Sequence, residues 1–92
     1  MNQPTSIRYN NYGKLYIPRD IRHKIYARDD WRCMMPRCFC PEGRDIDPKL
    51  FGKNENWAPS VDHLIPKVYG GADDERNFRA AHRYCNAATM KR

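Results

Sequence analysis

The 92-residue sequence predicts a small α+β domain that is stabilised by a bound metal ion, and three observations support this prediction. Isoleucines recur at four-residue spacing around Pro18, a period-two pattern runs over 60–65, and His82 stands three positions before Cys85 in a chain with further cysteines upstream. A chain this short buries only a small core, and a metal ion often supplies the missing stability. We therefore expect one domain over residues 1–92.

The first two segments should be an extended arm and a helix. Residues 1–16 are polar with scattered tyrosines and show no clear period, which is typical of an extended arm or a short strand. A helix is predicted within 17–30, because Pro18 suits a first-turn position and Asp20 lies near the positive end of the helix dipole. It should end near Arg28 and lay an apolar stripe on the core. This stripe consists of Ile17, Ile21 and Ile25.

The rest of the chain should contain a long loop, two strands and a helix. Residues 31–59 have recurrent Pro and Gly with little periodicity, which predicts a tight turn followed by a loop. The period-two pattern predicts a short strand over 60–65, and Pro66 ends it. After a Gly70-Gly71 turn, a second short strand and an alanine-rich helix are expected, over 77–82 and 83–92.

The net charge of +6 is unevenly distributed. Residues 1–44 contain nine Lys and Arg against four acids, residues 45–75 three against seven, and residues 76–92 five against none. Basic segments neutralise phosphates and therefore favour a nucleic-acid partner, although ordinary solvated charge would give the same counts.

No apolar run is long enough for a membrane span or a signal peptide, so we expect a soluble protein of the reducing cytoplasm with no membrane partner. Its four cysteines could form two disulfides, but in such a compartment a metal site is the better use of cysteines that accompany a histidine.

Four short motifs follow one another in the last third of the chain. They are Val61-Asp62-His63-Leu64-Ile65-Pro66, Gly70-Gly71, Asn77-Phe78 and His82-Arg83-Tyr84-Cys85-Asn86. Together they resemble the HNH endonuclease family, whose active site is the ββα-metal motif, also named the His-Me finger. The match covers 61–86 closely and extends back to Trp31-Arg32-Cys33. The resemblance implies a ββα-metal motif over 60–92, preceded by a zinc knuckle and loop over 31–59.

The resemblance also implies roles for four side chains. His63 would be the general base, because a neutral imidazole can take a proton from water near neutral pH. Asp62 and Asn86 would hold the catalytic ion, and since carboxylate and amide oxygens suit a hard cation, we expect Mg²⁺, with Mn²⁺ also active. Asn77, the middle asparagine of the family, would bond backbone across the loop and hold His63 in orientation.

A second metal site, for structural Zn²⁺, is expected from the cysteines. His82 and Cys85 have ligand spacing at the junction of the second strand and the closing helix. Cys33 supplies a third ligand, and Cys38 is favoured over Cys40 as the fourth, because the spacer between Cys33 and Cys38 lies within the range of zinc knuckles. The leftover cysteine would be a buried thiol. Two other interpretations of His82 stay open, as a surface histidine and as a ligand of the catalytic ion.

The sequence therefore predicts a stand-alone, zinc-stabilised HNH endonuclease that nicks or cuts DNA and leaves 5′-phosphate and 3′-hydroxyl ends, as the family does. DNA contacts are assigned as a group to basic side chains around the motif, with a second patch on the first helix. The first group is Lys67, Arg76, Arg79, Arg83, Lys91 and Arg92, and the second is Arg19, Arg22 and Arg28.

The small size fits, by family analogy, phage-encoded or mobile-element versions that act in the host cytoplasm, with a homodimer or a phage packaging protein as partner. Two rival functions are a zinc-stabilised nucleic-acid-binding module without cleavage activity, and a nuclease that selects RNA or a nucleic-acid structure.

Overall fold

The computed structural model describes residues 8–9 and 15–90, and within these ranges the predicted α+β class is confirmed. The helices and strands in chain order are β1 (Arg8–Tyr9), β2 (Leu15–Tyr16), α1 (Arg19–Arg28), β3 (Pro59–His63), β4 (Phe78–His82) and α2 (Arg83–Met90). Short 3-10 turns lie in the loops, over Pro48–Leu50, Lys67–Tyr69 and Glu75–Asn77. β1 and β2 pair antiparallel, and the rest of the predicted arm lies outside the described residues.

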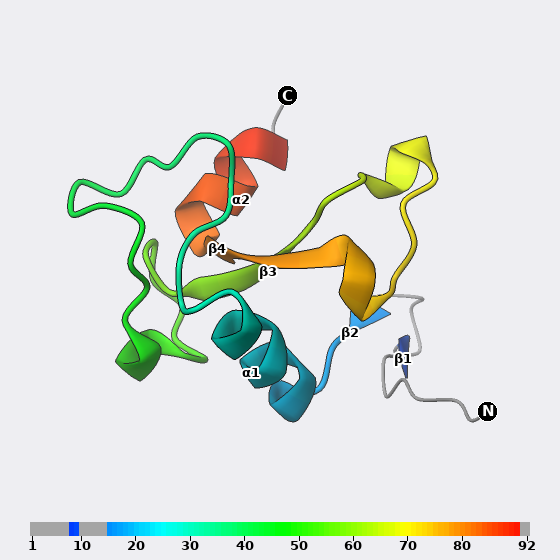
Figure 1. Cartoon of the computed structure of the whole chain (residues 1–92), viewed down its shortest axis with the longest axis horizontal. Helices are drawn as coiled ribbons and strands as arrows, with labels where there is room; N and C mark the ends of the chain where they lie inside the picture. The colour runs from blue at the N-terminus through cyan, green and yellow to red at the C-terminus, as the bar shows by residue number, and fades with distance from the viewer. Residues whose placement is uncertain (1–7, 10–14, 91–92) are drawn as a thin grey trace.

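The antiparallel β3–β4 hairpin is the centre of the fold, and it runs between α1 and α2 in Figure 1. Both helices contact both strands. The register pairs Pro59 with His82 and His63 with Phe78. The carboxyl end of β3 therefore lies beside the start of β4, at the end of the hairpin where the long connecting loop leaves and returns.

Helix α1 occupies the predicted segment. It begins after Pro18, whose carbonyl accepts the N–H of Arg22 at 3.0 Å. The expected apolar stripe faces the core, since Ile25 is 1% exposed and two further isoleucines pack partly buried against the same cluster. These two are Ile17 and Ile21.

The turn after α1 directs the following loop onto β4. Asp30 and Trp31 have left-handed backbone conformations, with φ of 60° and 52°, and these reverse the chain direction. The Asp29 carboxylate then accepts the N–H of Ala80 at 2.8 Å, and the Met34 N–H donates to the Ala80 carbonyl at 2.9 Å. The loop that carries the cysteines is thereby fixed along the edge of β4 that faces away from β3.

Strand β3 is shorter than the predicted strand over 60–65, because an asparagine side chain replaces the last step of the ladder. The Leu64 N–H still donates to the Asn77 carbonyl at 2.8 Å, but the Ile65 N–H donates to the side-chain oxygen of Asn77 at 2.9 Å. The strand consequently ends at His63 and the chain leaves the sheet there.

The core is one cluster of buried side chains from α1, the cysteine-bearing loop, β4 and α2. Its largest members are Tyr26, Phe78, Ile25 and Met35. The two cysteines and the histidine that are fully buried belong to the same volume, so the core and the candidate metal site are continuous. In the part of the chain that the structure describes, no helix has the length and apolar composition to cross a bilayer.

Candidate metal centre and active site

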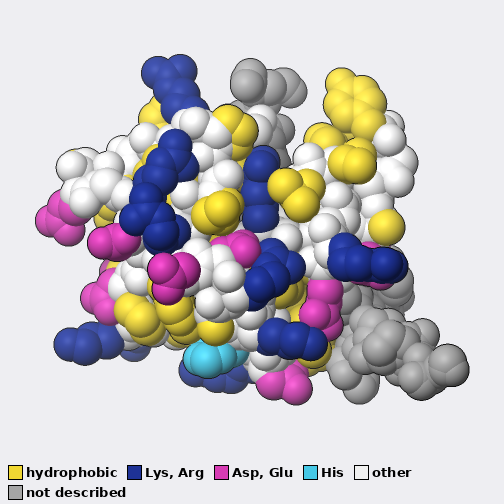
Figure 2. Space-filling model, viewed as in Figure 1, with side chains coloured by type: hydrophobic (Ala, Val, Ile, Leu, Met, Phe, Trp, Pro, Cys, Tyr) yellow, Lys and Arg dark blue, Asp and Glu magenta, His cyan; other side chains and the backbone are white. Residues whose placement is uncertain are grey.

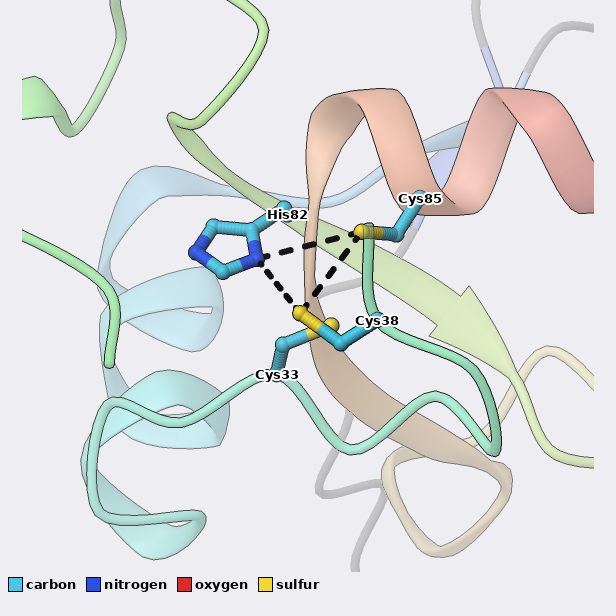
Figure 3. A group of neighbouring side chains, drawn as sticks. All are labelled: Cys33, Cys38, His82 and Cys85. Atoms are coloured by element: carbon cyan, nitrogen blue, oxygen red, sulfur yellow. Dashed lines mark hydrogen bonds between the residues drawn. The ribbon is translucent and has the colours of Figure 1, made fainter. Parts of the chain in front are cut away.

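Three cysteines and one histidine converge at the junction of β4 and α2 (Figure 3). Cys33 and Cys38 come from the loop after α1, His82 is the last residue of β4, and Cys85 lies in the first turn of α2. Their four candidate ligand atoms all lie within 4.8 Å of one another. Cys40 is outside this group. The structure thus brings together the four residues that the sequence favoured and separates the fifth.

The distances in the cluster fit a tetrahedral zinc site. Zn–S bonds of about 2.3 Å and Zn–N bonds of about 2.0 Å give tetrahedron edges of roughly 3.8 Å between two sulfurs and roughly 3.5 Å between sulfur and nitrogen. The Cys38 and Cys85 sulfurs are 4.0 Å apart, and they lie 3.5 and 3.9 Å from Nδ1 of His82. All four cysteines are free thiols. The donor set is therefore that of a structural Cys3His zinc site.

Neighbouring backbone groups orient these ligands. Nε2 of His82 lies 3.1 Å from the Asp45 carbonyl, which holds the ring proton on Nε2 and leaves Nδ1 to face the sulfurs. The Phe39 N–H donates to the Cys85 sulfur at 3.2 Å. Burial raises the pKa of the Cys85 thiol to about 12 and lowers the pKa of His82, so a thiolate in this pocket needs a bound cation beside it.

Asn86, directly after Cys85, carries a buried oxygen without a partner. Its side-chain N–H₂ group donates to the Val61 carbonyl and to the Ser60 hydroxyl, both at 3.0 Å. A carbonyl can only accept, so the amide nitrogen faces β3 and Oδ1 is directed elsewhere. Oδ1 is buried and accepts no hydrogen bond from any described residue. A buried amide oxygen left in this way is costly, and a bound cation would satisfy it.

The position of Ser60 links Asn86 to Asp62. Alternate side chains of a strand share a face, so Ser60 and Asp62 lie on the same face of β3, the face that Asn86 contacts. Ser60 and Asn86 also line a cleft of about 230 Å³, together with Arg83 and Tyr84. Carboxylate and amide oxygens on one face of β3 form a donor set that suits a hard divalent cation.

Asp62 is paired with a residue that the sequence had assigned to DNA. Nε of Arg79, its partner across the β3–β4 register, lies 2.7 Å from Oδ2 of Asp62, and both side chains are mostly buried. Arg79 therefore neutralises the carboxylate from within the protein. Its guanidinium stands beside the candidate catalytic ion site, not out on the surface.

His63 is held at the end of β3 by a carboxylate that the sequence analysis missed. Nε2 of His63 lies 2.8 Å from Oδ1 of Asp73, and the imidazole ring stands edge-on to Phe78 with centroids 5.0 Å apart. Asp73 belongs to a run of three acids, Asp73-Asp74-Glu75, a composition that is also typical of a turn. Its position four residues before Asn77, at the far end of the same loop, is the signal that could have identified it.

Asn77 clamps the loop between the two strands. Its side-chain N–H₂ group donates to the carbonyls of Ile65 (3.0 Å) and Ala72 (2.9 Å), while its oxygen accepts the Ile65 N–H. Gly71 passes so close that a Cβ there would lie 1.7 Å from the Ile65 carbonyl oxygen. Gly70 has a φ of 90°, which favours glycine. Gly70, Gly71 and Asn77 thus together hold the loop between β3 and β4 closed.

Comparison with known proteins bears directly on this hairpin. Residues 52–92 match the model of the HNH endonuclease family. This part of the chain is thus similar to an HNH endonuclease domain. No curated protein and no solved structure gives a significant match. An HNH domain implies a nuclease-family function and a nucleic-acid substrate.

The HNH domain contains the candidate active site but only half of the candidate zinc site. Asp62, His63, Asn77 and Asn86 all lie within 52–92, as do His82 and Cys85. The other two cysteines of the cluster precede the match. The segment before the HNH domain therefore completes the metal centre on which α2 begins.

The basic side chains around the HNH domain mostly have acidic neighbours. Figure 2 shows Lys and Arg next to Asp and Glu over this face, with no single basic patch. Lys67 pairs with Asp73, and Arg76 pairs with Asp74 on the exposed surface. Among the described residues, Arg83 forms no ion pair, and it lines a cleft of about 500 Å³ beside β3. Lys91 and Arg92 lie outside the described residues.

The second predicted basic patch, on α1, is largely engaged in structural contacts. Arg28 donates to the carbonyls of Glu75 and Phe78. Arg19 and Arg22 both stack over the Phe51 ring. These contacts within the protein are by themselves a sufficient reason for the arginines on α1, whether or not they also bind a nucleic acid.

The loop between β3 and β4 ends in exposed apolar side chains. Val68 is 84% and Tyr69 80% exposed, and yellow side chains gather at the tip of this loop at the upper right of Figure 2. They stand next to Lys67, a few residues beyond His63.

Proposed function

We propose that this chain is a divalent-metal-dependent endonuclease that hydrolyses DNA phosphodiester bonds, with His63 as general base. The observation that carries this proposal is the buried, unpartnered Oδ1 of Asn86 on the Asp62 face of β3. A module that only binds DNA has no need of a buried oxygen that lacks a donor. Asp62 and Asn86 would hold the ion, and Mg²⁺ is the expected species, with Mn²⁺ as a substitute.

The proposed reaction needs three contributions. His63 takes a proton from the attacking water, the new oxygen–phosphorus bond forms, and the bond to the 3′-oxygen breaks. The departing 3′-oxygen takes a proton from a solvent water, which leaves 5′-phosphate and 3′-hydroxyl ends. The bound ion would supply charge neutralisation at the phosphate. Arg79 holds the Asp62 carboxylate and adds a further positive charge beside the site.

The structural ion would be Zn²⁺ bound by the Cys3His cluster. Its contribution is to fix the start of α2, and hence the position of Asn86 directly after Cys85.

A nucleic-acid substrate is favoured because its phosphates match the basic groups beside β3 and in the connecting loop, and by family analogy we propose DNA. Lys67, Arg76 and Arg83 would supply these phosphate contacts, Arg79 would add positive charge from its pair with Asp62, and the apolar loop tip at Val68 would add contacts with sugars in the minor groove. By family analogy we also propose a phage or mobile-element origin, with a second copy or a packaging protein as partner. Whether both strands are cut would depend on that partner.

The test is conversion of supercoiled plasmid to open-circular or linear DNA in Mg²⁺ or Mn²⁺, with an EDTA control. His63→Ala should abolish conversion, whereas His23→Ala, which changes an exposed histidine on α1, should leave it intact. Folded, zinc-loaded protein that shifts DNA but never cleaves it, with any DNA or ion tried, would instead support a binding module. Cleavage of RNA alone would keep the mechanism and change the substrate.

A further inference from the structure

Asp73 lies between the candidate general base and a lysine. Its Oδ1 is 2.8 Å from Nε2 of His63, and its Oδ2 is 2.9 Å from Nζ of Lys67. Its side chain is only 9% exposed, whereas the Lys67 side chain that reaches it from the surface is 53% exposed. Both carboxylate oxygens are thus engaged, one by the imidazole and the other by the ammonium group.

We propose that Asp73 is the positioning residue for His63, in that it accepts the Nε2–H hydrogen bond and keeps the lone pair of Nδ1 free for the proton of the attacking water. This inference rests on the proposed nuclease function. A neutral imidazole carries one N–H, and a carboxylate offers only acceptors, so the proton resides on the nitrogen that faces Asp73. Nδ1 is then the only ring nitrogen that can act as a base.

The loop geometry explains why this contact forms. The Asn77 amide ties the Ala72 carbonyl to the Ile65 carbonyl, and Asp73 is the next residue after Ala72. The two ends of the loop are therefore closed directly beside His63. Asn77 was expected to orient the histidine directly; on this proposal it would act indirectly, because its bond to the Ala72 carbonyl holds the residue next to Asp73.

The Asp73→Asn variant gives a sharp test because of Lys67. The Lys67 ammonium group can only donate hydrogen bonds, so it would bind the side-chain oxygen of the new asparagine. The asparagine N–H₂ group would then turn toward His63. It would then donate to Nε2 and move the ring proton to Nδ1, the nitrogen that must be free. Asp74→Asn is the matched control, because Asp74 is the neighbouring acid, pairs with Arg76 on the surface, and has no contact with His63.

Two measurements read the effect. Two-bond ¹H–¹⁵N correlation spectra separate protonated from unprotonated ring nitrogens, and the chain has three histidines, so His63 can be assigned by substitution. In the neutral imidazole, wild-type His63 should carry its proton on Nε2 and the Asp73→Asn variant on Nδ1. The same substitution should lower kcat by about 10²-fold or more, the contribution of a general base, while KM, zinc content and DNA affinity stay within about twofold.

Two results would overturn the inference. One is a wild-type His63 that carries its proton on Nδ1. Because this measurement uses only the wild-type protein, it tests the role of Asp73 even if the Asp73→Asn protein fails to fold. The other is an Asp73→Asn protein whose tautomer and kcat match those of Asp74→Asn. A wild-type protein that cleaves no nucleic acid would count against the proposed function, whereas the tautomer measurement would still decide the role of Asp73.

Discussion

Asp62 carries the negative charge that a divalent ion beside Asn86 would require. Asp62→Asn keeps the size of the side chain and its place opposite Arg79, but it removes the charge. We expect the loss of about 3 kcal/mol of charge stabilisation, which is roughly a 10²-fold fall in kcat/KM, and a higher Mg²⁺ concentration for half-maximal activity. Plasmid cleavage across a Mg²⁺ titration measures both quantities.

The matched control for Asp62 is Asp20→Asn, which removes an equal charge from the exposed first turn of α1. It should leave the Mg²⁺ titration unchanged. If Asp62→Asn gave the wild-type Mg²⁺ dependence, the ion would have to be held by other groups.

Cys38 and Cys40 are two positions apart, but they lie in different environments. Cys38→Ser should reduce bound zinc well below one equivalent per chain and lower the Tm by more than about 10 °C, since a structural ion contributes directly to folding. Cys40→Ser should retain the zinc and shift the Tm by only about 2 °C. Metal content by atomic spectroscopy and thermal melts under reducing conditions compare the pair. Equal zinc loss in both variants would mean that Cys40 also binds.

At the residue scale, the sequence identified side chains whose role depends on local spacing and missed those whose role depends on register. His82 and Cys85 are three positions apart, so their convergence follows from local geometry. The sequence did not indicate that Arg79 faces Asp62, because that pairing depends on the register of the hairpin. Asp73 was missed because its contact with His63 exists only after the ten-residue connection has closed.

At the element scale, the loop between β3 and β4 depends on the absence of a side chain at Gly71. Gly71→Ala would place a methyl group 1.7 Å from the Ile65 carbonyl oxygen, so the loop must open. We expect a cost above about 2 kcal/mol and a fall in cleavage activity, because Asp73 and His63 separate when the loop moves.

Gly70→Ala is the matched control for that loop. A Cβ at Gly70 meets nothing within 4 Å, and only its φ of 90° is unfavourable, so the cost should be about 1–2 kcal/mol. Chemical denaturation gives both free energies of unfolding. The explanation fails if Gly70→Ala proves the more damaging of the two.

Elements were easier to predict than their ends. Pro18 and the isoleucine spacing gave α1 correctly, because both signals are local. The end of β3 was placed at Ile65 instead of His63, because the ladder is interrupted by the side chain of Asn77, which is distant in sequence. The reversal at Asp30 and Trp31 was expected only as a turn, since positive φ at a tryptophan has no sequence signal.

On the scale of the whole molecule, the metal cluster joins two parts of the chain that sequence comparison treats differently. The HNH match covers 52–92, yet Cys33 and Cys38 lie before it and supply half of the cluster. α1 also packs against both strands of the hairpin and shares its core. The sequence indicated the ligands and the position of Asn86 directly after Cys85, but it could not show that this cluster adjoins the core.

This arrangement predicts that the chain must bind zinc in order to fold before the catalytic Mg²⁺ can bind. Transfer into magnesium-free buffer should abolish cleavage while zinc content, circular dichroism and the Tm stay unchanged, because the catalytic ion binds to a site that is already folded. Removal of zinc by a strong chelator under reducing conditions should abolish the cooperative melt, since Cys85 and the start of α2 lose their anchor. Mg²⁺ alone should then fail to restore activity, whereas Zn²⁺ followed by Mg²⁺ should restore it. Zinc-free protein that melts cooperatively at the original Tm and cleaves DNA with Mg²⁺ alone would show that the cluster holds no structural ion.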